Sequence, residues 1–422
     1  MVRKLVKSVL FVSFLFLSSC QSIADTVLQA SQPPMVPTPI LEETFSIPET
    51  PLQLPPTFTV VIPTETATVP PTPVITATID PSLPTATPTP LVLGLTGFPP
   101  GINPLTGLAV ADPSLLDRRP VMVKVSNYPR SGRPHAGLSY ADVVFEYYIG
   151  EECNRFLAVY YGQDAPKVGP MRSGRLVDAQ LVFMYQGVLA YGNADPQVDE
   201  VLVEKLGKRA ISFNDSPCPP VCGHDTHSVT GVFVDTAEMS KFSVEEGVDN
   251  IRQDLNGMIF NEKPWASDQF GIQVAVQYSR RDRGEWHYDT ETGKYLRWIE
   301  AEKPGYKDQY YMIPLVDRLN NEQITFSNVI IIFANYIEYA PTLHEIEILN
   351  NTEGQRAILF RDGLMIEGKW RTVSPEEPIH FTDMRGLPLG LKPGNTWIVI
   401  AGMSSSFDEV LSGILEMHFA LP

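Results

Sequence analysis

A stretch of 70 residues, 31–100, limits which parts of this 422-residue chain can fold. It holds 18 prolines and 15 threonines, and neither a lysine nor an arginine. Such a composition cannot bury enough apolar surface to offset the entropy of ordering the chain, so we expect the stretch to be disordered. Proline favours an extended backbone of about 3.1 Å per residue, which gives a reach on the order of 200 Å. The stretch therefore predicts a tether.

The first 20 residues predict an export signal that ends in a lipidation site. The basic start MVRKLVK precedes an apolar run over residues 8–17, which is too short to span a membrane. The run ends in LSSC, which resembles a bacterial lipobox, so Cys20 is expected to carry acyl groups such as palmitate. The alternative is an ordinary signal peptide with an incidental cysteine. We therefore expect a lipid-anchored protein on the extracytoplasmic face of the cell membrane.

The residues after the tether alternate at first between strand-like and helix-like segments. Three segments rich in Val, Phe and Tyr predict strands at 120–126, 142–149 and 155–162. Two segments with apolar residues at helical spacing predict helices at 175–186 and 196–207. This part of the chain is therefore expected to combine helices and strands.

After about residue 264 the pattern changes to strands. The segment YDTETGKYLRW, for example, predicts a hairpin whose turn uses Gly293. The predicted fold class is α+β, with a mixed α/β N-terminal domain followed by a mostly β C-terminal domain. The four predicted parts are the lipoprotein signal peptide at 1–20, the disordered Pro/Thr-rich tether at 21–101, the mixed α/β domain at 102–264 and the mostly β domain at 265–422.

The second predicted domain contains aromatic residues at positions that look exposed, namely Trp286, Tyr288, Tyr295, Trp298, Trp370 and Trp397. Aromatic faces on the surface stack on sugars, which would suit a wall-associated protein. Cross-strand aromatic pairs equally stabilise hairpins, and this interpretation is favoured.

Charge and motif content exclude several classes of protein. The net charge of −17 argues against a nucleic-acid binder, because such proteins bind by neutralising phosphates. No polybasic segment follows the anchor, so electrostatic attraction to anionic lipid is not expected. Neither a GxGxxG motif nor a P-loop is present, and we expect no cofactor.

Several motifs together resemble a known family. The motifs are NPLTGL, RPVMVKVSN, RPHAGLSYADVVFE, RFLAVY, VGPMRSGR and YGNADPQ, with GKW and LKPGNTWI later in the chain. They resemble the YerB-like family of bacterial lipoproteins over nearly all of the folded part. The resemblance implies an exported two-domain lipoprotein and no particular activity, because the family is uncharacterised.

The motif VGPMRSGR is the strongest candidate for a binding site. It leads into the predicted helix, and the N–H groups at a helix start together with guanidinium groups favour an anion. We predict that Arg172, Arg175, Arg133 and Asn127 contact a small anionic or cell-wall-derived ligand. The alternative is that these arginines pair with carboxylates such as Glu146 and hold loops in place.

The predicted function is therefore a tethered binding module rather than an enzyme. One alternative is a cell-envelope hydrolase that uses His227 as a base with Asp195 or Asp225, since histidine is a common general base. Another is an interaction module that docks an exported protein through the β domain. An arginine pocket open to solvent would favour the binding module.

The stretch SPCPPVCGHDTHS holds four residues that are able to bind zinc, namely Cys218, Cys222, His224 and His227. Outside the membrane thiols tend to oxidise, and two prolines between cysteines four apart favour a turn within disulfide range. A zinc site would have to draw all its ligands from one loop. We predict a Cys218–Cys222 disulfide that positions His227 near the candidate site, and no metal. Zinc binding and free thiols are the alternatives, and Cys153 is left as the odd thiol.

Overall fold

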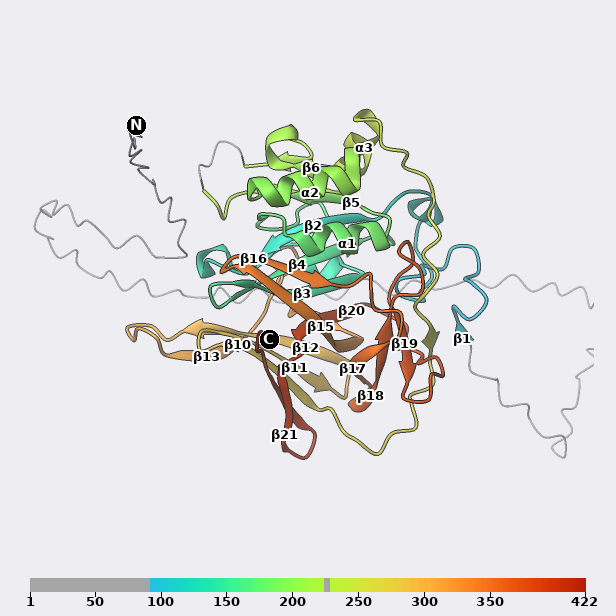
Figure 1. Ribbon diagram of the computed structural model, residues 1–422, viewed down its shortest axis with the longest axis vertical. Coiled ribbons are helices and arrows are strands. Elements are labelled where there is room, and N and C mark those ends of the chain that lie inside the picture. Colours follow the sequence, from blue (N-terminus) through green and yellow to red (C-terminus); the bar gives the residue numbers. More distant parts are fainter. Residues whose placement is uncertain (1–91, 224–227) are drawn as a thin grey trace, which may run out of the picture. The chain divides into compact units, whose positions relative to one another are not determined.

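The computed structural model describes residues 92–223 and 228–422 (Figure 1). The predicted lipidation site Cys20, nearly all of the predicted tether and the predicted base His227 lie outside the described residues. The proposals that concern them therefore rest on the sequence.

An eleven-stranded sheet runs through the centre of the described part. Across the sheet its strands are β19 (His380–Asp383), β18 (Leu364–Arg371), β17 (Gln355–Arg361), β15 (Asn328–Ala340), β20 (Thr396–Gly402), β3 (Val143–Gly150), β4 (Cys153–Tyr160), β2 (Val121–Ser126), β5 (Val188–Tyr191) and β6 (Ala210–Ser212), and β16 (Leu343–Glu347) pairs with β15. The central strand β20 pairs in parallel with β15 and with β3. Strands from before and after residue 264 therefore share one sheet, and the predicted boundary at that residue stays a prediction.

A seven-stranded sheet is built from the C-terminal part. Its strands are β13 (Tyr310–Pro314), β12 (Lys294–Glu302), β11 (Asp282–Asp289), β10 (Gln273–Ser279), β22 (Ile414–His418) and β21 (Ser406–Leu411), with β14 (Thr325–Phe326) beside β12. β11 and β12 form the predicted hairpin, in which Asp289 pairs with Lys294. Gly293 has a φ of +66° in this turn, a conformation that favours glycine.

Between residues 92 and 264, in the part that the structure describes, there are three α-helices, namely α1 (Leu176–Met184), α2 (Pro196–Leu206) and α3 (Thr236–Glu245). Asp195 and Asp235 cap α2 and α3 through their side chains. The remaining short elements are the strand pairs β1 (Val92–Leu93) with β9 (Phe260–Asn261) and β7 (Val221–Cys222) with β8 (Phe233–Val234), and the 3-10 helices η1 (Pro113–Asp117), η2 (Arg130–Gly132), η3 (Leu138–Tyr140), η4 (Gly207–Arg209) and η5 (Phe213–Asp215). The α+β fold class is confirmed, since the described part before residue 264 contains both helices and strands and the part after it consists mainly of strands.

Each face of the large sheet is covered by a different layer. On one face, Phe145 and Leu157 lie in an apolar cluster with residues of α1 and α2. On the other face, Val144 and Phe156 lie in a cluster with α3 and with the strands of the second sheet. Because the central strands of this sheet are buried on both faces, their sequences are almost continuously apolar.

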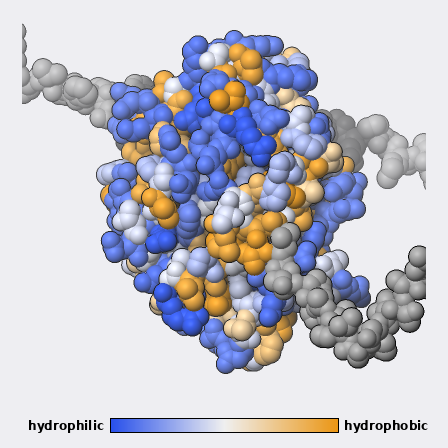
Figure 2. All heavy atoms as spheres, turned by 90° about the vertical axis from the view of Figure 1, so that its right-hand side faces the viewer, coloured by the Kyte–Doolittle hydropathy of each residue, from blue (hydrophilic) through white to orange (hydrophobic). Residues whose placement is uncertain are grey.

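On the face of the molecule drawn in Figure 2, hydrophilic side chains surround a patch of hydrophobic ones.

The aromatic residues expected at the surface lie mostly in this core. Trp286, Tyr295, Trp370 and Trp397 are fully buried. The Trp397 ring meets the Trp286 ring edge-on, with centroids 5.8 Å apart. The expectation of exposed rings was wrong for these four residues. Trp286, Tyr295 and Trp397 are enclosed where the two sheets pack together, and Trp370 lies in the apolar cluster on the opposite face of the large sheet.

His135 is a buried histidine whose protonation opposes folding. Its Nε2 lies 2.8 Å from the Ser126 carbonyl, and its ring packs edge-on against Phe156. Burial, with a further contribution from Arg133, lowers the pKa of His135 to about 3. The unfolded chain takes up a proton near the usual pKa of 6.5 while the folded state stays neutral, so stability falls as the pH falls below 6.5.

We expect this histidine to reduce the free energy of unfolding by about 1.4 kcal/mol at pH 5.5 relative to pH 7.5. A His135→Asn variant should lack this dependence. Urea unfolding of both proteins at the two pH values measures the difference. An equal loss of stability in the two proteins would contradict the assignment.

Candidate functional site

A pocket next to the start of α1 brings together segments that lie far apart in the sequence. Its volume is about 320 Å³. Its lining includes Arg172 and Ser173, Gly192 and Asn193, and Gly223 and Ser228. The first two pairs belong to the motifs VGPMRSGR and YGNADPQ, and the third pair flanks the undescribed residues 224–227. A ligand here would therefore meet two of the sequence motifs at once.

Arg172 is held at the pocket wall by its backbone and by the loop after β2. Its N–H donates to the Lys124 carbonyl at 2.9 Å, and its carbonyl accepts from the Gly192 N–H at 2.8 Å. A Cβ at position 192 would lie 3.0 Å from the Arg172 backbone, so glycine permits this close approach. The guanidinium donates to Ser126 Oγ at 3.4 Å and to the Tyr128 carbonyl at 3.5 Å. These contacts fix a cation at the wall.

Three buried ionisable side chains lie close to Arg155 and Arg175. Lys124 Nζ on β2 lies 3.1 Å from Asp178 Oδ1 on α1, and the Tyr147 hydroxyl on β3 contacts both groups. Burial lowers the pKa of Lys124 to about 7; Asp178 opposes this change, and nearby arginines add to it. Lys124 is therefore close to the balance between its charged and neutral forms at neutral pH.

Two more arginines add positive charge to the same region. Arg155 on β4 donates to the Ser173 carbonyl at 3.0 Å. Arg175, the N-cap of α1, donates to the preceding carbonyl at 2.8 Å. Burial lowers the pKa of Arg175, Asp178 opposes this, and Arg172 adds to the lowering. Arg172 and Arg175 are thus close enough to repel each other.

The structure places the other two predicted contacts in a different network. Arg133 lies 3.0 Å from Glu300 Oε1 and donates to the Asn127 carbonyl at 3.1 Å. Asn127 is buried and donates to Asn154 Oδ1 at 2.5 Å. Neither residue lines the pocket of Arg172, and Arg175 is not one of its lining residues either. For Arg133 the partner is a carboxylate, as in the alternative interpretation of the sequence.

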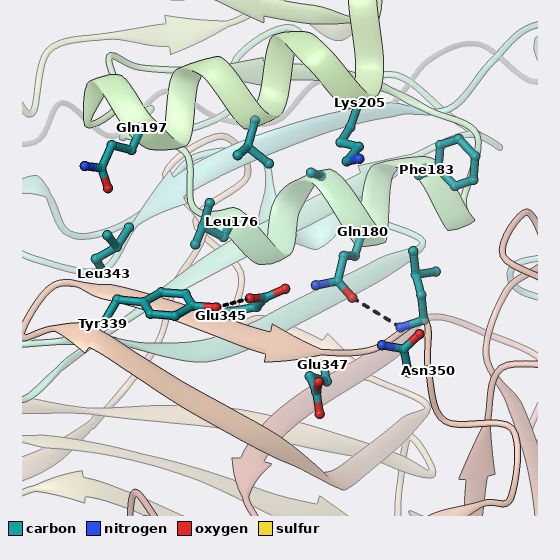
Figure 3. A pocket seen from close by; sticks show the side chains of 13 residues that line it. Leu176, Gln180, Phe183, Gln197, Lys205, Tyr339, Leu343, Glu345, Glu347 and Asn350 are labelled. Atoms are coloured by element: carbon teal, nitrogen blue, oxygen red, sulfur yellow. Dashed lines mark hydrogen bonds between the residues drawn. The ribbon is translucent and has the colours of Figure 1, made fainter.

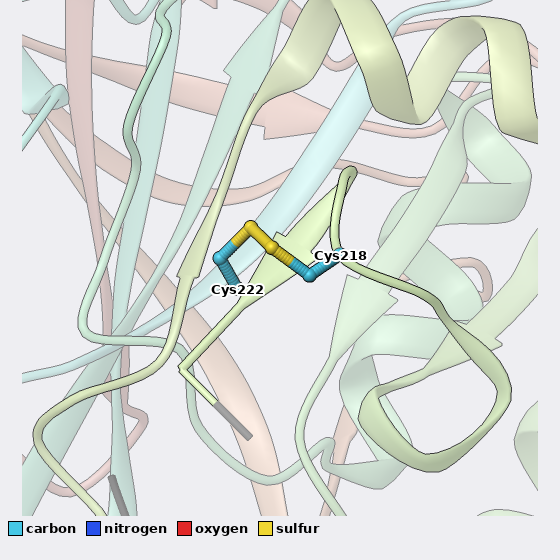
Figure 4. Close-up of a disulfide and its surroundings, with 2 residues drawn as sticks. All are labelled: Cys218 and Cys222. Carbon is cyan, nitrogen blue, oxygen red and sulfur yellow. A yellow bond between two sulfur atoms is a disulfide. The ribbon is translucent and has the colours of Figure 1, made fainter. Parts of the chain in front are cut away.

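Cys218 and Cys222 form a disulfide directly before Gly223, which lines the pocket (Figure 4). Cys153 is buried. Within residues 92–223 and 228–422, no group of three or more His, Cys, Asp or Glu side chains is able to hold a metal ion. Of the two expected partners of His227 in a hydrolase, Asp225 lies outside the described residues, and Asp195 accepts the Gln197 N–H at 2.9 Å as the cap of α2.

Lys124, Tyr147 and Asp178 were not predicted as part of the site. The one signal in the sequence is a lysine between valines in PVMVKVS, where a buried strand would normally hold apolar residues. Asp178 comes 54 positions after Lys124 and 31 positions after Tyr147 in the sequence, so only the fold brings the three side chains together.

Comparison with known proteins places these features in a family. The model described as "Protein of unknown function (DUF3048) N-terminal domain" matches residues 105–238, and the corresponding C-terminal domain model matches residues 274–398. Together the two models cover more than half of the chain, in the expected order. The fold and the paired matches define a two-part α+β protein, and the chain belongs to this DUF3048 family.

One relative has both a curated sequence and a solved structure. "Putative lipoprotein YerB" from Bacillus subtilis (strain 168) is 25% identical over 310 residues, which cover 70% of this chain and 85% of the relative. The crystal structure of YerB protein from Bacillus subtilis matches with a TM-score of 0.58 at 24% identity, covering 71% of this chain and 96% of that chain. The resemblance to YerB-like proteins is thereby confirmed. In the described part of the chain, no helix is long and apolar enough to cross a membrane.

Proposed function

We propose that this protein is a lipid-anchored, extracytoplasmic binding module for a small anionic ligand, with Arg172 as its central contact. The lipobox at Cys20 and the name of the lipoprotein relative support the anchor. The Pro/Thr-rich tether over 21–101 would hold the folded part away from the membrane, within reach of cell-wall fragments.

The observation that carries the proposal is the Arg172 side chain at the wall of a pocket in an acidic protein. Further arginines, Arg155 and Arg175, lie in the surrounding structure, next to the Lys124–Asp178 pair. Guanidinium groups bind carboxylate and phosphate oxygens through paired, charge-assisted hydrogen bonds. A phosphate or carboxylate in the pocket would meet the Arg172 side chain at the wall.

Thermal unfolding with a panel of ligands tests the proposal. The panel contains phosphate, citrate, a muropeptide, an uncharged disaccharide and zinc. We expect anions to raise the melting temperature, because a ligand at 100 times its Kd stabilises the folded state by about 2.7 kcal/mol. The disaccharide and zinc should leave the melting temperature unchanged.

An Arg172→Gln variant should bind the stabilising anion about 10 to 100 times more weakly, since charge-assisted hydrogen bonds contribute about 1.5–3 kcal/mol. Arg385→Gln is the matched control, because that side chain is 80% exposed and pairs with Asp383 in its own turn. Equal anion affinity in the wild type and the Arg172 variant would overturn the proposal, as would a panel in which no anion stabilises the protein.

A further inference from the structure

A second cavity, of about 790 Å³, lies between helices α1 and α2 and the β15–β16 hairpin (Figure 3). Its walls are mainly apolar, with contributions from Leu176, Ala179, Phe183, Val201, Leu343 and Leu349. Cavities of this size and lining are typical of sites that bind small organic molecules. We call it the α1–β16 groove.

Two carboxylates lie along the β16 side of the α1–β16 groove. Glu345 and Glu347 are two residues apart on β16, so their side chains lie on the same face of the strand. Both line the cavity. Glu345 Oε2 accepts from the Tyr339 hydroxyl at 2.6 Å, and Glu347 Oε2 accepts from Asn335 Nδ2 at 2.9 Å. Among the described side chains, no lysine, arginine or histidine forms an ion pair with either carboxylate. Lys205, at the end of α2, also lines the groove, but its ammonium group contacts Glu204 and neither of these two carboxylates.

The backbone next to these carboxylates is already occupied by a side chain. Gln180 of α1 donates from Nε2 to the Ile346 carbonyl at 2.9 Å. Its Oε1 accepts from the N–H groups of Ile348 and Leu349 at 3.0 and 3.2 Å. The amide thus takes the place of a neighbouring strand at the edge of β16. A ligand in the groove would therefore contact side chains and would not extend the sheet.

We propose that the α1–β16 groove binds a small amphiphilic cation. The apolar part of the ligand packs between α1, α2 and Leu343, and its ammonium or guanidinium group pairs with Glu345 and Glu347. The charge of the site selects a cation, because an apolar surrounding strengthens attraction between opposite charges and penalises a second anion. This preference is opposite to that of the Arg172 pocket, so the two sites are distinguishable.

Calorimetric titration of the purified protein with decylamine, decanoate and decanol, each below its micelle concentration, tests the proposal. The three probes share one apolar chain and differ in the charge of the head group. We expect decylamine to bind at least ten times more tightly than decanoate, with decanol between them. Equal affinities for decylamine and decanoate would overturn the proposed selectivity.

Variants separate the contribution of charge from that of the apolar wall. Glu345→Gln combined with Glu347→Gln should remove the preference for decylamine and keep the affinity for decanol. Val201→Trp fills the groove and should weaken all three probes about tenfold or more. Val203→Trp is the control, since Val203 lies on the same helix, is 51% exposed and does not line the cavity. Unchanged binding by Val201→Trp, or equal losses in both tryptophan variants, would refute binding in the groove.

Discussion

Replacing Glu146 with alanine is expected to lower the free energy of unfolding by about 3–5 kcal/mol, because it leaves a buried arginine without a counter-ion. Glu146 Oε2 lies 3.2 Å from Arg297 and accepts from Trp397 Nε1 at 2.7 Å. Its other oxygen accepts from Asn154 Nδ2 at 2.6 Å. Glu146 and Arg297 are both fully buried, on β3 of the large sheet and β12 of the second sheet. The pair therefore joins the two sheets.

Urea unfolding at pH 7 measures this loss, with Glu367→Ala as the matched control. Glu367 pairs with Arg356 at 2.7 Å, but both side chains are at least 40% exposed, so the control should lose less than about 1 kcal/mol. A loss of the same size in both variants would mean that the Glu146–Arg297 pair does not stabilise the contact between the sheets.

Lys124 should make the stability of the protein rise between pH 7 and pH 9.5 by about 3 kcal/mol. Burial lowers the pKa of Lys124 to about 7, whereas the lysine of the unfolded chain titrates near 10.5. Between these values the unfolded state holds more protons than the folded state, so raising the pH favours folding. Asp178 opposes the shift without cancelling it.

A Lys124→Met variant should lose this rise. Lys205→Met is the control, because the Lys205 side chain is 60% exposed. Urea unfolding of the three proteins at pH 7 and pH 9.5 gives the comparison. If the wild type and the Lys124 variant gain stability in parallel, the lysine is not held in its neutral form by the fold.

Local features of the fold were predictable because they depend on neighbouring residues. The β11–β12 hairpin follows from alternating strand residues around Gly293, and α2 follows from Pro196 in its first turn and Gly207 after its end. Helix α3 was missed, although Asp235 caps it, because its sequence TAEMSKFSVE has few apolar residues at helical spacing. The parallel pairing of β20 with β3 joins segments about 250 residues apart, and no local pattern specifies it.

The candidate site was predictable only in part, for the same reason. Arg172 was expected from its motif and lines the pocket. Arg133 looked equivalent in the sequence, but its partner Glu300 lies 167 residues later. The sequence around Lys124 predicts a strand and gives no sign of an ion pair. Its partner Asp178 belongs to a helix, and the sequence does not reveal how that helix packs. Contacts between distant segments therefore determine where each arginine lies.

The most direct measurement of anion binding is the location of a bound anion in crystals of this protein. Tungstate has the charge of a phosphate dianion and gives a strong anomalous signal, so crystals soaked in it report the position of the ion. We predict an anomalous peak in the pocket, within hydrogen-bond distance of the Arg172 guanidinium, and no peak there in crystals of Arg172→Gln. Peaks confined to other surfaces in wild-type crystals, or a peak that persists in the variant, would contradict the account.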